Sequence, residues 1–189
     1  MTPTRGTLIL VVGPSGAGKD TLILAAKERL ADDARFHFPR RDITRAAEAG
    51  GEAHNPVDLD TFTARRAAGG YALSWGAHAL FYGIPVASLD HLERGTSVVV
   101  NVSRSVIDEA RRLYPPVAVL SLSVPEAVLR ARLAARGRET REQIESRVAR
   151  ARSVPVQGTN VYEIVNDGPL ETSISRFMAA VIDAESLGI

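Results

Sequence analysis

The sequence predicts an α/β fold in which a parallel β-sheet carries helices on both faces. Three observations favour it. Short apolar runs rich in valine, typical of strands buried on both faces, recur along the chain. Helical patterns separate these runs, as the crossovers between parallel strands require. A glycine-rich segment follows the first run and precedes the first helical pattern, so we expect a ligand at the carboxyl ends of the strands.

The elements alternate along most of the chain. Strands are expected at residues 7–12, 35–38, 97–102, 117–123 and 161–165, which gives a five-stranded sheet. Helices are expected at residues 19–30, 58–68, 85–94, 104–113, 125–136, 140–152 and 170–185. Residues 40–56 lack apolar periodicity, and residues 71–85 have the pattern of an antiparallel hairpin. We expect these two segments to form a separate lobe over the sheet.

Composition limits the classes of function. With 189 residues, 45% of them hydrophobic, the chain can bury one sizeable core, so we expect one domain over residues 1–189. The net charge of +1 gives no bulk electrostatic case for binding nucleic acid or an anionic membrane. Cysteine is absent, and no signal-like or membrane-spanning apolar segment is visible. We expect a cytoplasmic protein that acts on small molecules; its oligomeric state stays open.

Residues 13–20, Gly-Pro-Ser-Gly-Ala-Gly-Lys-Asp, match the phosphate-binding P-loop except at the last position, where serine or threonine is usual. The glycines let backbone N–H groups turn inward around phosphate oxygens, and the following helix adds the positive end of its dipole. Lys19 is expected to reach the β- and γ-phosphates of ATP. The expected ATP contacts in and beside the loop are Gly13, Pro14, Ser15, Gly16, Ala17, Gly18, Lys19, Asp20 and Thr21.

The aspartate at position 20 of the P-loop affects how Mg²⁺ is expected to bind. A hydroxyl usually ligates Mg²⁺ at this position, and a carboxylate at the end of another strand supports the ion. Here residues 97–102 offer Asn101 at their end, followed by Ser103, and no acid. We expect exchanged roles: Asp20 supplies the carboxylate near Mg²⁺, while Asn101 and Ser103 orient acceptor or metal-bound water. Thr21 as the hydroxyl ligand, and Asp20 as an ordinary first-turn residue, are the alternatives.

Two arginine groups could stabilise a transferring phosphoryl group, which needs positive charge and exclusion of water. Eight arginines lie within residues 130–152, across a helix-glycine-helix break that could hinge as a lid. Three more lie within residues 40–45, where planar guanidinium groups suit a phosphate-bearing acceptor. For both groups, a solvated surface is the alternative. His54 and His78 lack the spacing of zinc ligands, and Trp75 is expected to pack in the hairpin.

Several motifs together resemble the guanylate kinase group of nucleoside monophosphate kinases over nearly the whole chain. They are the P-loop, Ile-Thr-Arg at residues 43–45, Gly-Glu at 51–52, the Ser-Trp and Tyr-Gly pairs of the hairpin, Arg-Gly-x-Glu at 136–139 and Val-Asn-Asp at 165–167. The resemblance implies a P-loop, nucleoside monophosphate kinase-like fold with an ATP-binding core, an acceptor-binding lobe at about 40–85 and an arginine-rich lid at about 130–152. It also implies that Arg136 and Arg147 are catalytic lid arginines alongside Lys19, that Asn166 lies beside the adenine, and that Arg41, Arg45 and Tyr82 contact the acceptor phosphate.

The polar residues that read guanine in that group are replaced here. Residues 46–48 hold no second arginine, His54 and the following Asn-Pro stand in place of a tyrosine segment, and Ser74 replaces the glutamate before the hairpin tryptophan. A site built to hydrogen-bond a base rejects analogues strongly, so removal of these groups argues against guanine as the acceptor.

The replacements resemble a narrower group, the ribose 1,5-bisphosphate phosphokinases of phosphonate catabolism. That group shares the P-loop ending in aspartate, Arg-x-Ile-Thr-Arg, Gly-x-Glu-x-His, Leu-Ser-Trp-x-Ala-His, Tyr-Gly, Val-Val-Asn-x-Ser-Arg, Arg-Gly-Arg-Glu and Asn-Asp-Gly, all of which this chain contains. Ala46 departs from it, because proline usually follows Thr-Arg there.

The narrower resemblance implies a transferase that uses ATP and Mg²⁺ to phosphorylate ribose 1,5-bisphosphate, a sugar phosphate, to 5-phosphoribosyl 1-diphosphate (PRPP). An acceptor with two phosphates and no base suits arginines and small polar groups. The expected acceptor contacts are Arg41, Arg45, His54, Ser74, His78, Tyr82, Asn101, Ser103 and Arg104. A nucleoside monophosphate kinase, and a guanylate kinase-like binding module without catalysis, are the alternatives; such modules typically lose the phosphate loop, which is intact here.

Overall fold

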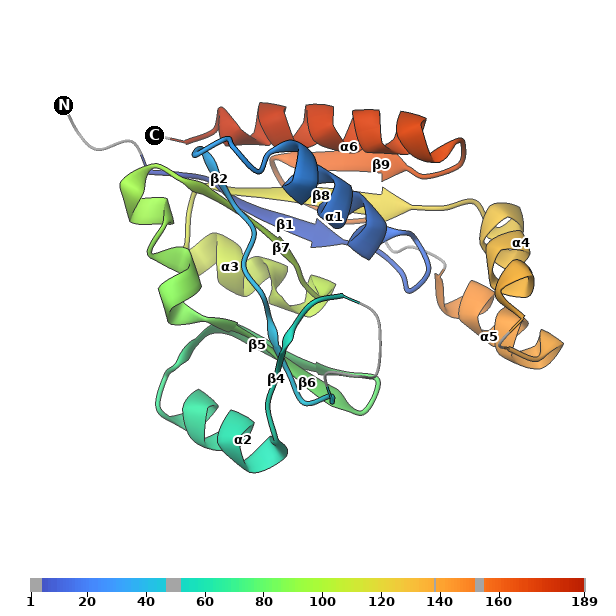
Figure 1. Cartoon of the computed structure of the whole chain (residues 1–189), viewed down its shortest axis with the longest axis horizontal. Coiled ribbons are helices and arrows are strands. Elements are labelled where there is room, and N and C mark those ends of the chain that lie inside the picture. The colour runs from blue at the N-terminus through green and yellow to red at the C-terminus, as the bar shows by residue number, and fades with distance from the viewer. Residues whose placement is uncertain (1–4, 47–51, 138, 152–154, 189) are drawn as a thin grey trace.

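The computed structural model describes residues 5–46, 52–137, 139–151 and 155–188 (Figure 1), without the side chains of Arg136 and Arg150. Its main sheet has five strands in the order β2-β7-β1-β8-β9, and every neighbouring pair is parallel. The strands are β1 (Leu8–Val12), β2 (Phe36–His37), β7 (Ser97–Asn101), β8 (Val117–Ser123) and β9 (Val161–Val165). The predicted five-stranded parallel sheet is confirmed.

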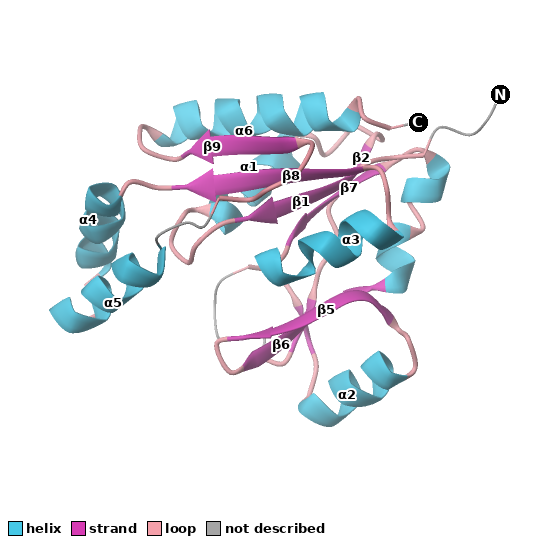
Figure 2. Cartoon of the chain, turned by 180° about the vertical axis from the view of Figure 1, so that it is seen from behind, coloured by secondary structure: helices cyan, strands magenta, loops and turns pink. Residues whose placement is uncertain are grey.

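Both faces of this sheet are covered, as predicted. Alternate residues of β1 point to opposite faces: Leu8, Leu10 and Val12 belong to one apolar cluster, whereas Ile9 and Val11 belong to another. The second cluster includes the helices α1 (Lys19–Arg29) and α6 (Leu170–Glu185). The first includes α3 (Ile107–Leu113) and part of the lobe, on the face seen in Figure 2. Burial on both faces explains why β1 is apolar throughout.

The helix predicted at residues 85–94 is wrong in type. Two short 3₁₀ segments, Val86–Leu89 and Leu92–Arg94, stand there instead. Each segment places one leucine in the core, Leu89 from the first and Leu92 from the second. The helix predicted from residue 104 likewise begins with a 3₁₀ turn, Arg104–Val106, ahead of α3.

A second sheet of four strands, in the order β4-β3-β6-β5, stands apart from the main sheet (Figures 1 and 2). Its strands are β3 (Asp42–Ile43), β4 (Asn55–Pro56), β5 (Tyr71–Ala77) and β6 (Leu80–Pro85), and α2 (Leu59–Ala67) packs on it through Phe62. The predicted hairpin at residues 71–85 is confirmed as the antiparallel pair β5–β6. We call this sheet with α2 the lobe.

The hairpin turn has an uncommon backbone. His78 and Ala79 join Ala77 to Leu80, and their φ angles are 53° and 61°. A tight two-residue hairpin of the I′ type needs positive φ at both central positions, where asparagine and glycine are the preferred residues. Neither residue here is one of these, so the turn is held against its local preference.

The helices α4 (Glu126–Arg136) and α5 (Arg141–Ala151) form a pair beyond the carboxyl end of β8 (Figure 1). Leu129 and Leu133 of α4 pack against Ile144 and Val148 of α5, in an apolar cluster separate from the sheet core. The amphipathic patterns in residues 125–136 and 140–152 therefore bury their apolar faces against each other.

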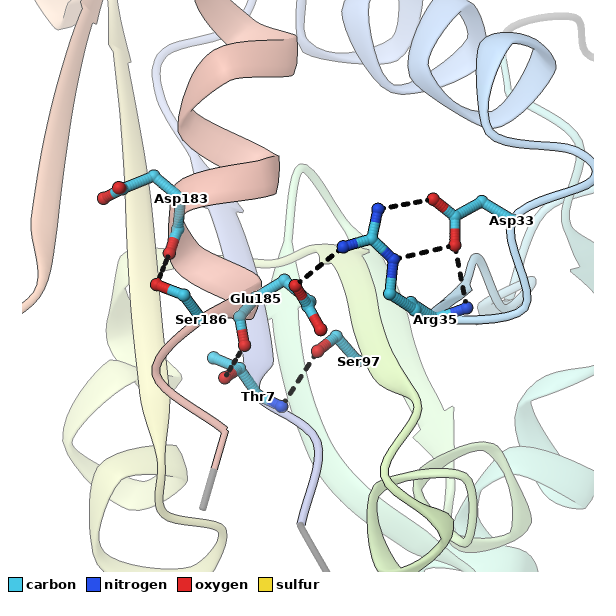
Figure 3. Close-up of polar contacts among 7 residues, drawn as sticks. All are labelled: Thr7, Asp33, Arg35, Ser97, Asp183, Glu185 and Ser186. Carbon is cyan, nitrogen blue, oxygen red and sulfur yellow. Dashed lines mark hydrogen bonds and ion pairs between the residues drawn. The ribbon is translucent and has the colours of Figure 1, made fainter.

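The amino ends of the strands are fastened to the end of α6 (Figure 3). Arg35, just before β2, forms ion pairs with Asp33 at 2.8 Å and with Glu185 of α6 at 3.1 Å. The Thr7 amide donates to Ser97 Oγ at 3.0 Å. The P-loop lies at the opposite, carboxyl end of the sheet. None of the helices within the described part of the chain is long and apolar enough to cross a membrane.

Candidate active site

The P-loop connects β1 to α1 and takes a backbone that only glycine adopts easily. Gly13, Gly16 and Gly18 have φ angles of 154°, 90° and 88°. A Cβ atom added to Gly18 would lie 2.6 Å from Asn166 Nδ2, and one added to Gly13 would lie 2.7 Å from the carbonyl oxygen of Leu122. The loop is therefore pressed against β8 and the segment after β9, which fixes its curvature.

Lys19, the first residue of α1, reaches back across the loop. Its Nζ donates hydrogen bonds to the carbonyl oxygens of Gly13 at 2.7 Å and Pro14 at 3.0 Å. Burial lowers the pKa of Lys19 to about 8, and the charges of Arg41 and Arg104 lower it further against the opposing effect of Asp20. A bound polyphosphate would place negative charge beside this ammonium group and so favour its protonated form.

Asp20 and Asn101 meet between α1 and the end of β7. Asn101 Nδ2 donates to Asp20 Oδ1 at 2.9 Å. Asn101 is the last residue of β7, the strand next to β1, so the parallel register brings its side chain to the start of α1. Ser103 follows it and caps the 3₁₀ turn, because its Oγ accepts from the amide of Ser105 at 3.3 Å.

A cleft of about 610 Å³ opens between the P-loop, the end of β7 and the lobe. Most of the site residues expected from the sequence line it. They are Gly13, Ser15, Gly16, Gly18, Lys19, Asp20, Thr21, Arg41, Arg45, His78, Tyr82, Asn101, Ser103, Arg104 and Arg147. Pro14 lines a neighbouring cavity of about 490 Å³, which it shares with His78 and Arg147.

Arg41 is fixed by the groups around it. Its Nε donates to Glu52 Oε1 at 2.7 Å, its Nη2 forms an ion pair with the same oxygen, and its Nη1 donates to the carbonyl oxygen of Asn101 at 3.1 Å. The guanidinium group lies over the rings of Tyr82 and Trp75, 5.1 and 5.8 Å from their centroids. Its charge is thus neutralised and its orientation set within the protein.

Arg104 and Arg45 differ from Arg41 in having unused donors. Among the described residues, Nε and Nη2 of Arg104 and Nε of Arg45 are buried and have no hydrogen-bond partner. Both side chains line the cleft. A buried N–H without a partner costs free energy, so these guanidinium groups are suited to an anionic ligand that completes their hydrogen bonding.

Arg147 of α5 connects the helical pair to the P-loop. Its Nη2 donates to Ser15 Oγ at 2.8 Å, and its Nη1 forms an ion pair with Glu139. Arg130 instead pairs with Glu145 on the half-exposed surface of the pair, so the alternative of a solvated face holds for that arginine. The side chain of Arg136 lies outside the described residues.

Besides Pro14, four of the expected site residues that the structure describes do not line the main cleft. His54 is buried, and its ring nitrogens lie 3.1 Å from the carbonyl oxygen of Arg45 and 3.0 Å from that of Glu52, so it contacts the backbone at both residues. Ser74 precedes Trp75 in β5. Trp75 and Ala77 line the cleft, and because a strand alternates its faces, Ser74 faces the other way. Ala17 is buried in the core beneath the loop.

Asn166, the fourth, is buried behind the P-loop. Its Nδ2 donates to the carbonyl oxygen of Ala17 at 2.8 Å, and its Oδ1 accepts from Ser173 Oγ at 2.8 Å and from Arg132 Nη2 at 3.2 Å. A place beside the adenine stays a prediction for this residue.

Sequence reasoning assigned no part in the binding site to two side chains that line the cleft, Glu52 and Trp75; it expected Trp75 only to pack in the hairpin. The Gly-x-Glu-x-His motif contains Glu52, and that motif was the available signal.

No protein-family model matches the chain. Among curated proteins, ribose 1,5-bisphosphate phosphokinase PhnN of Acidiphilium cryptum (strain JF-5) is 44% identical over 185 residues, which cover 98% of this chain and 97% of that protein. The bifunctional ribose 1,5-bisphosphokinase-thymidine phosphorylase of Azorhizobium caulinodans is 41% identical over 177 residues, and the match spans only 26% of that protein's length. The chain therefore corresponds to about a quarter of the bifunctional relatives.

Solved structures show the same fold. The crystal structure of guanylate kinase from Anaplasma phagocytophilum has a TM-score of 0.69 over 98% of this chain and 89% of that one, at 17% sequence identity. The family is shown by the sequence: identity of 42–44% to ribose 1,5-bisphosphate phosphokinases over 92–98% of this chain establishes that it belongs to the ribose 1,5-bisphosphate phosphokinase family.

Proposed function

We propose that the chain transfers the γ-phosphoryl group of ATP to the 1-phosphate of ribose 1,5-bisphosphate and forms 5-phospho-α-D-ribosyl 1-diphosphate. The observation that carries this proposal is the cleft, which joins a P-loop with its lysine to a wall bearing the unpaired donors of Arg45 and Arg104. Phosphoryl transfer requires that a donor phosphate and an acceptor phosphate be held next to each other, and this cleft has groups suited to phosphate on both sides.

The chemistry follows from the charges around the loop. An oxygen of the acceptor's 1-phosphate attacks the γ-phosphorus of ATP, the bond to the β–γ bridging oxygen breaks, and ADP leaves. Lys19 neutralises charge on the β- and γ-phosphates, and Arg147 stabilises the charge that develops on the transferring group. Arg104, whose charge already acts on Lys19, holds the attacking phosphate in line.

Mg²⁺ fits the donor set at the start of α1. Mg²⁺ prefers oxygen ligands, and the carboxylate of Asp20 and the hydroxyl of Thr21 both line the cleft. Among the described residues, the Asn101 amide is the one hydrogen-bond partner of the Asp20 carboxylate, and it engages Oδ1. We propose that Asp20 holds the ion directly or through water, and that Asn101 orients this carboxylate. The ion would neutralise the phosphate oxygens when bound.

We also propose a division of labour within one domain. The main sheet with α1 binds ATP, the lobe at about residues 40–85 binds the acceptor, and the pair α4–α5, at about residues 130–152, closes as a lid that carries Arg136 and Arg147. The dependence on ATP favours action in the cytoplasm.

An acceptor panel tests the proposal. The protein is incubated with Mg-ATP and ribose 1,5-bisphosphate, GMP, AMP or gluconate, and ADP formation is measured, with Lys19→Met as the inactive control. We expect ADP with ribose 1,5-bisphosphate alone. ADP with GMP but not with the bisphosphate would instead support a nucleoside monophosphate kinase, and binding without ADP from any acceptor would support a module without catalysis.

The metal role of Asp20 has its own test. Asp20→Ser restores the usual P-loop residue but removes the carboxylate, so we expect Mg²⁺-dependent activity to fall. The exposed Asp90→Ser serves as the matched control. Full Mg²⁺-dependent activity in Asp20→Ser would contradict the exchange of roles.

A further inference from the structure

We infer that Glu52 recognises the ribose hydroxyls of the acceptor, and that Arg41 is the residue that positions it. The inference rests on the proposed function, because it names the residue that binds the sugar hydroxyls of the acceptor, which the phosphate-binding arginines do not contact. It starts from an asymmetry in the ion pair. Both Arg41 contacts go to Oε1 of Glu52, and among the described residues no hydrogen bond reaches Oε2.

The asymmetry is informative because arginine and a carboxylate commonly pair through two parallel hydrogen bonds, one to each oxygen. A pair that served only to neutralise a buried guanidinium group would be expected to use both oxygens. Glu52 instead lines the cleft and keeps one oxygen for another donor. Its side chain is 19% exposed, so this oxygen is partly desolvated and gains from a ligand donor.

A carboxylate in a cleft for phosphates would ordinarily repel its ligand. Arg41 removes this difficulty, because the pair carries no net charge. The pair is also rigid: Arg41 is bound to the carbonyl oxygen of Asn101 at the end of β7, and it lies over the stacked rings of Trp75 and Tyr82, whose centroids are 5.5 Å apart. Glu52 is therefore held in place by both the main sheet and the lobe.

The chemistry of the acceptor identifies the donor. Ribose 1,5-bisphosphate has two phosphate groups, which suit arginine and lysine, and two free hydroxyls at C2 and C3, which donate hydrogen bonds. The acidic side chains among the described residues that line the cleft are Asp20 and Glu52. Asp20 lies beside the P-loop, where the proposed function assigns it to Mg²⁺. Glu52 is paired with Arg41 and is therefore the carboxylate available to a sugar hydroxyl on the lobe side.

The test compares ribose and deoxyribose ligands. Trp75 is the chain's one tryptophan, and it stacks in the cleft wall, so its fluorescence reports both ligand binding and the integrity of the site. Ribose 5-phosphate and 2-deoxyribose 5-phosphate are titrated against this signal. In parallel, kcat/KM is measured with ribose 1,5-bisphosphate and its 2-deoxy and 3-deoxy analogues. We expect the wild-type protein to favour the ribose ligand by about tenfold or more over at least one deoxy analogue.

Two variants remove the carboxylate in different ways. Glu52→Gln replaces a charge-assisted hydrogen bond with a neutral one, which is about half as strong, so the preference should fall to about threefold or less. The double variant Arg41→Met with Glu52→Met removes the ion pair without leaving a buried charge, and it should abolish the preference. Glu171→Gln, in an exposed ion pair with Arg29 on another face, is the matched control and should keep it.

The outcomes separate the inference from the proposed function. A wild-type protein that does not discriminate between ribose and deoxyribose ligands, or a folded variant that keeps the full preference, would overturn the inference and leave Glu52 as the structural partner of Arg41. So would an increased Mg²⁺ requirement in Glu52→Gln with unchanged preference. Failure of the wild-type protein to phosphorylate ribose 1,5-bisphosphate, with the preference still visible in Trp75 fluorescence, would instead contradict the proposed reaction alone.

Discussion

Arg147 Nη2 donates a hydrogen bond of 2.8 Å to Ser15 Oγ, so the helical pair α4–α5 is joined directly to the P-loop. Glu139 holds the other side of the same guanidinium group. The arginine is therefore placed over the loop before ATP arrives, and its present partner is a hydroxyl that a phosphate oxygen can replace.

The two ends of this hydrogen bond should contribute unequally to activity. Arg147→Gln removes a donor aimed at the transferring group, and we expect kcat to fall by about 10²- to 10³-fold. Ser15→Ala removes the hydroxyl that Arg147 contacts but keeps the backbone N–H with which a P-loop binds phosphate, so kcat should change by less than about fivefold. Steady-state kinetics with saturating ATP measure both, and Arg130→Gln on the same helical pair is the control. Equal effects of Arg147→Gln and Arg130→Gln would contradict the assignment.

Lys19 should make ATP binding depend on pH. Its pKa is lowered to about 8 in the free protein because the ammonium group is buried, and the phosphates of ATP favour the charged form and so raise that pKa in the complex. Binding above pH 8 must then take up a proton. We expect affinity to fall with rising pH above 8, by at most about tenfold per unit.

Calorimetry from pH 7 to 9.5, in buffers of different ionisation enthalpy, measures both the affinity and the proton uptake. Lys19→Arg stays charged throughout this range and should give a flatter profile. A slope as steep in Lys19→Arg as in the wild-type protein would assign the pH dependence to another group.

Asp42 should stabilise the lobe. This carboxylate is 1% exposed and accepts hydrogen bonds from Tyr71 Oη at 2.9 Å and Asn55 Nδ2 at 3.1 Å, besides an ion pair with Arg65 of α2. Asp42→Asn leaves these donors around a neutral amide, and we expect the free energy of unfolding to fall by about 1–3 kcal/mol. Urea denaturation measures it. The exposed Asp60→Asn should cost much less, and a similar loss there would show that Asp42 has no special part.

Ala79 offers a stabilising substitution. Its φ of 61° suits glycine better than alanine, so Ala79→Gly should raise the free energy of unfolding by about 0.5–1 kcal/mol, less the entropy that glycine adds to the unfolded chain. Thermal unfolding compares it with Ala53→Gly, at an exposed position without positive φ, which should not gain stability. A loss in Ala79→Gly as large as that in Ala53→Gly would contradict strain in the turn.

Much of the fold could be predicted because its signals are local. The buried runs of β1 and β8 have few polar residues, and the glycines of the P-loop indicate where the backbone turns around a ligand. β3 and β4 could not be predicted, because each has only two residues and both lie within residues 40–56, which lack apolar periodicity. The segment at Val86–Leu89 was predicted as a helix because both helix types place apolar residues three apart.

The sequence predicted which residues line the candidate site better than it predicted how each one is paired and oriented there. The sequence identified Arg41 and Arg104 equally as phosphate contacts, but tertiary packing separates them: Arg41 is paired with Glu52, whereas Arg104 keeps unused buried donors. Such a distinction depends on residues far apart in the chain. Ser74 was expected at the cleft because it stands where the guanylate kinase group has its guanine-reading glutamate. Trp75 lines the cleft instead, and neighbours in a strand face opposite ways.

Asn166 has a mechanical consequence. One amide group joins the carbonyl of Ala17 in the P-loop, Arg132 of α4 and Ser173 of α6. The middle of α4 is thereby linked through Arg132 to the loop and to the core. The closure that we propose for α4 and α5 therefore has to keep or break the Arg132–Asn166 hydrogen bond, so this one amide couples the position of the helical pair to the backbone of the P-loop.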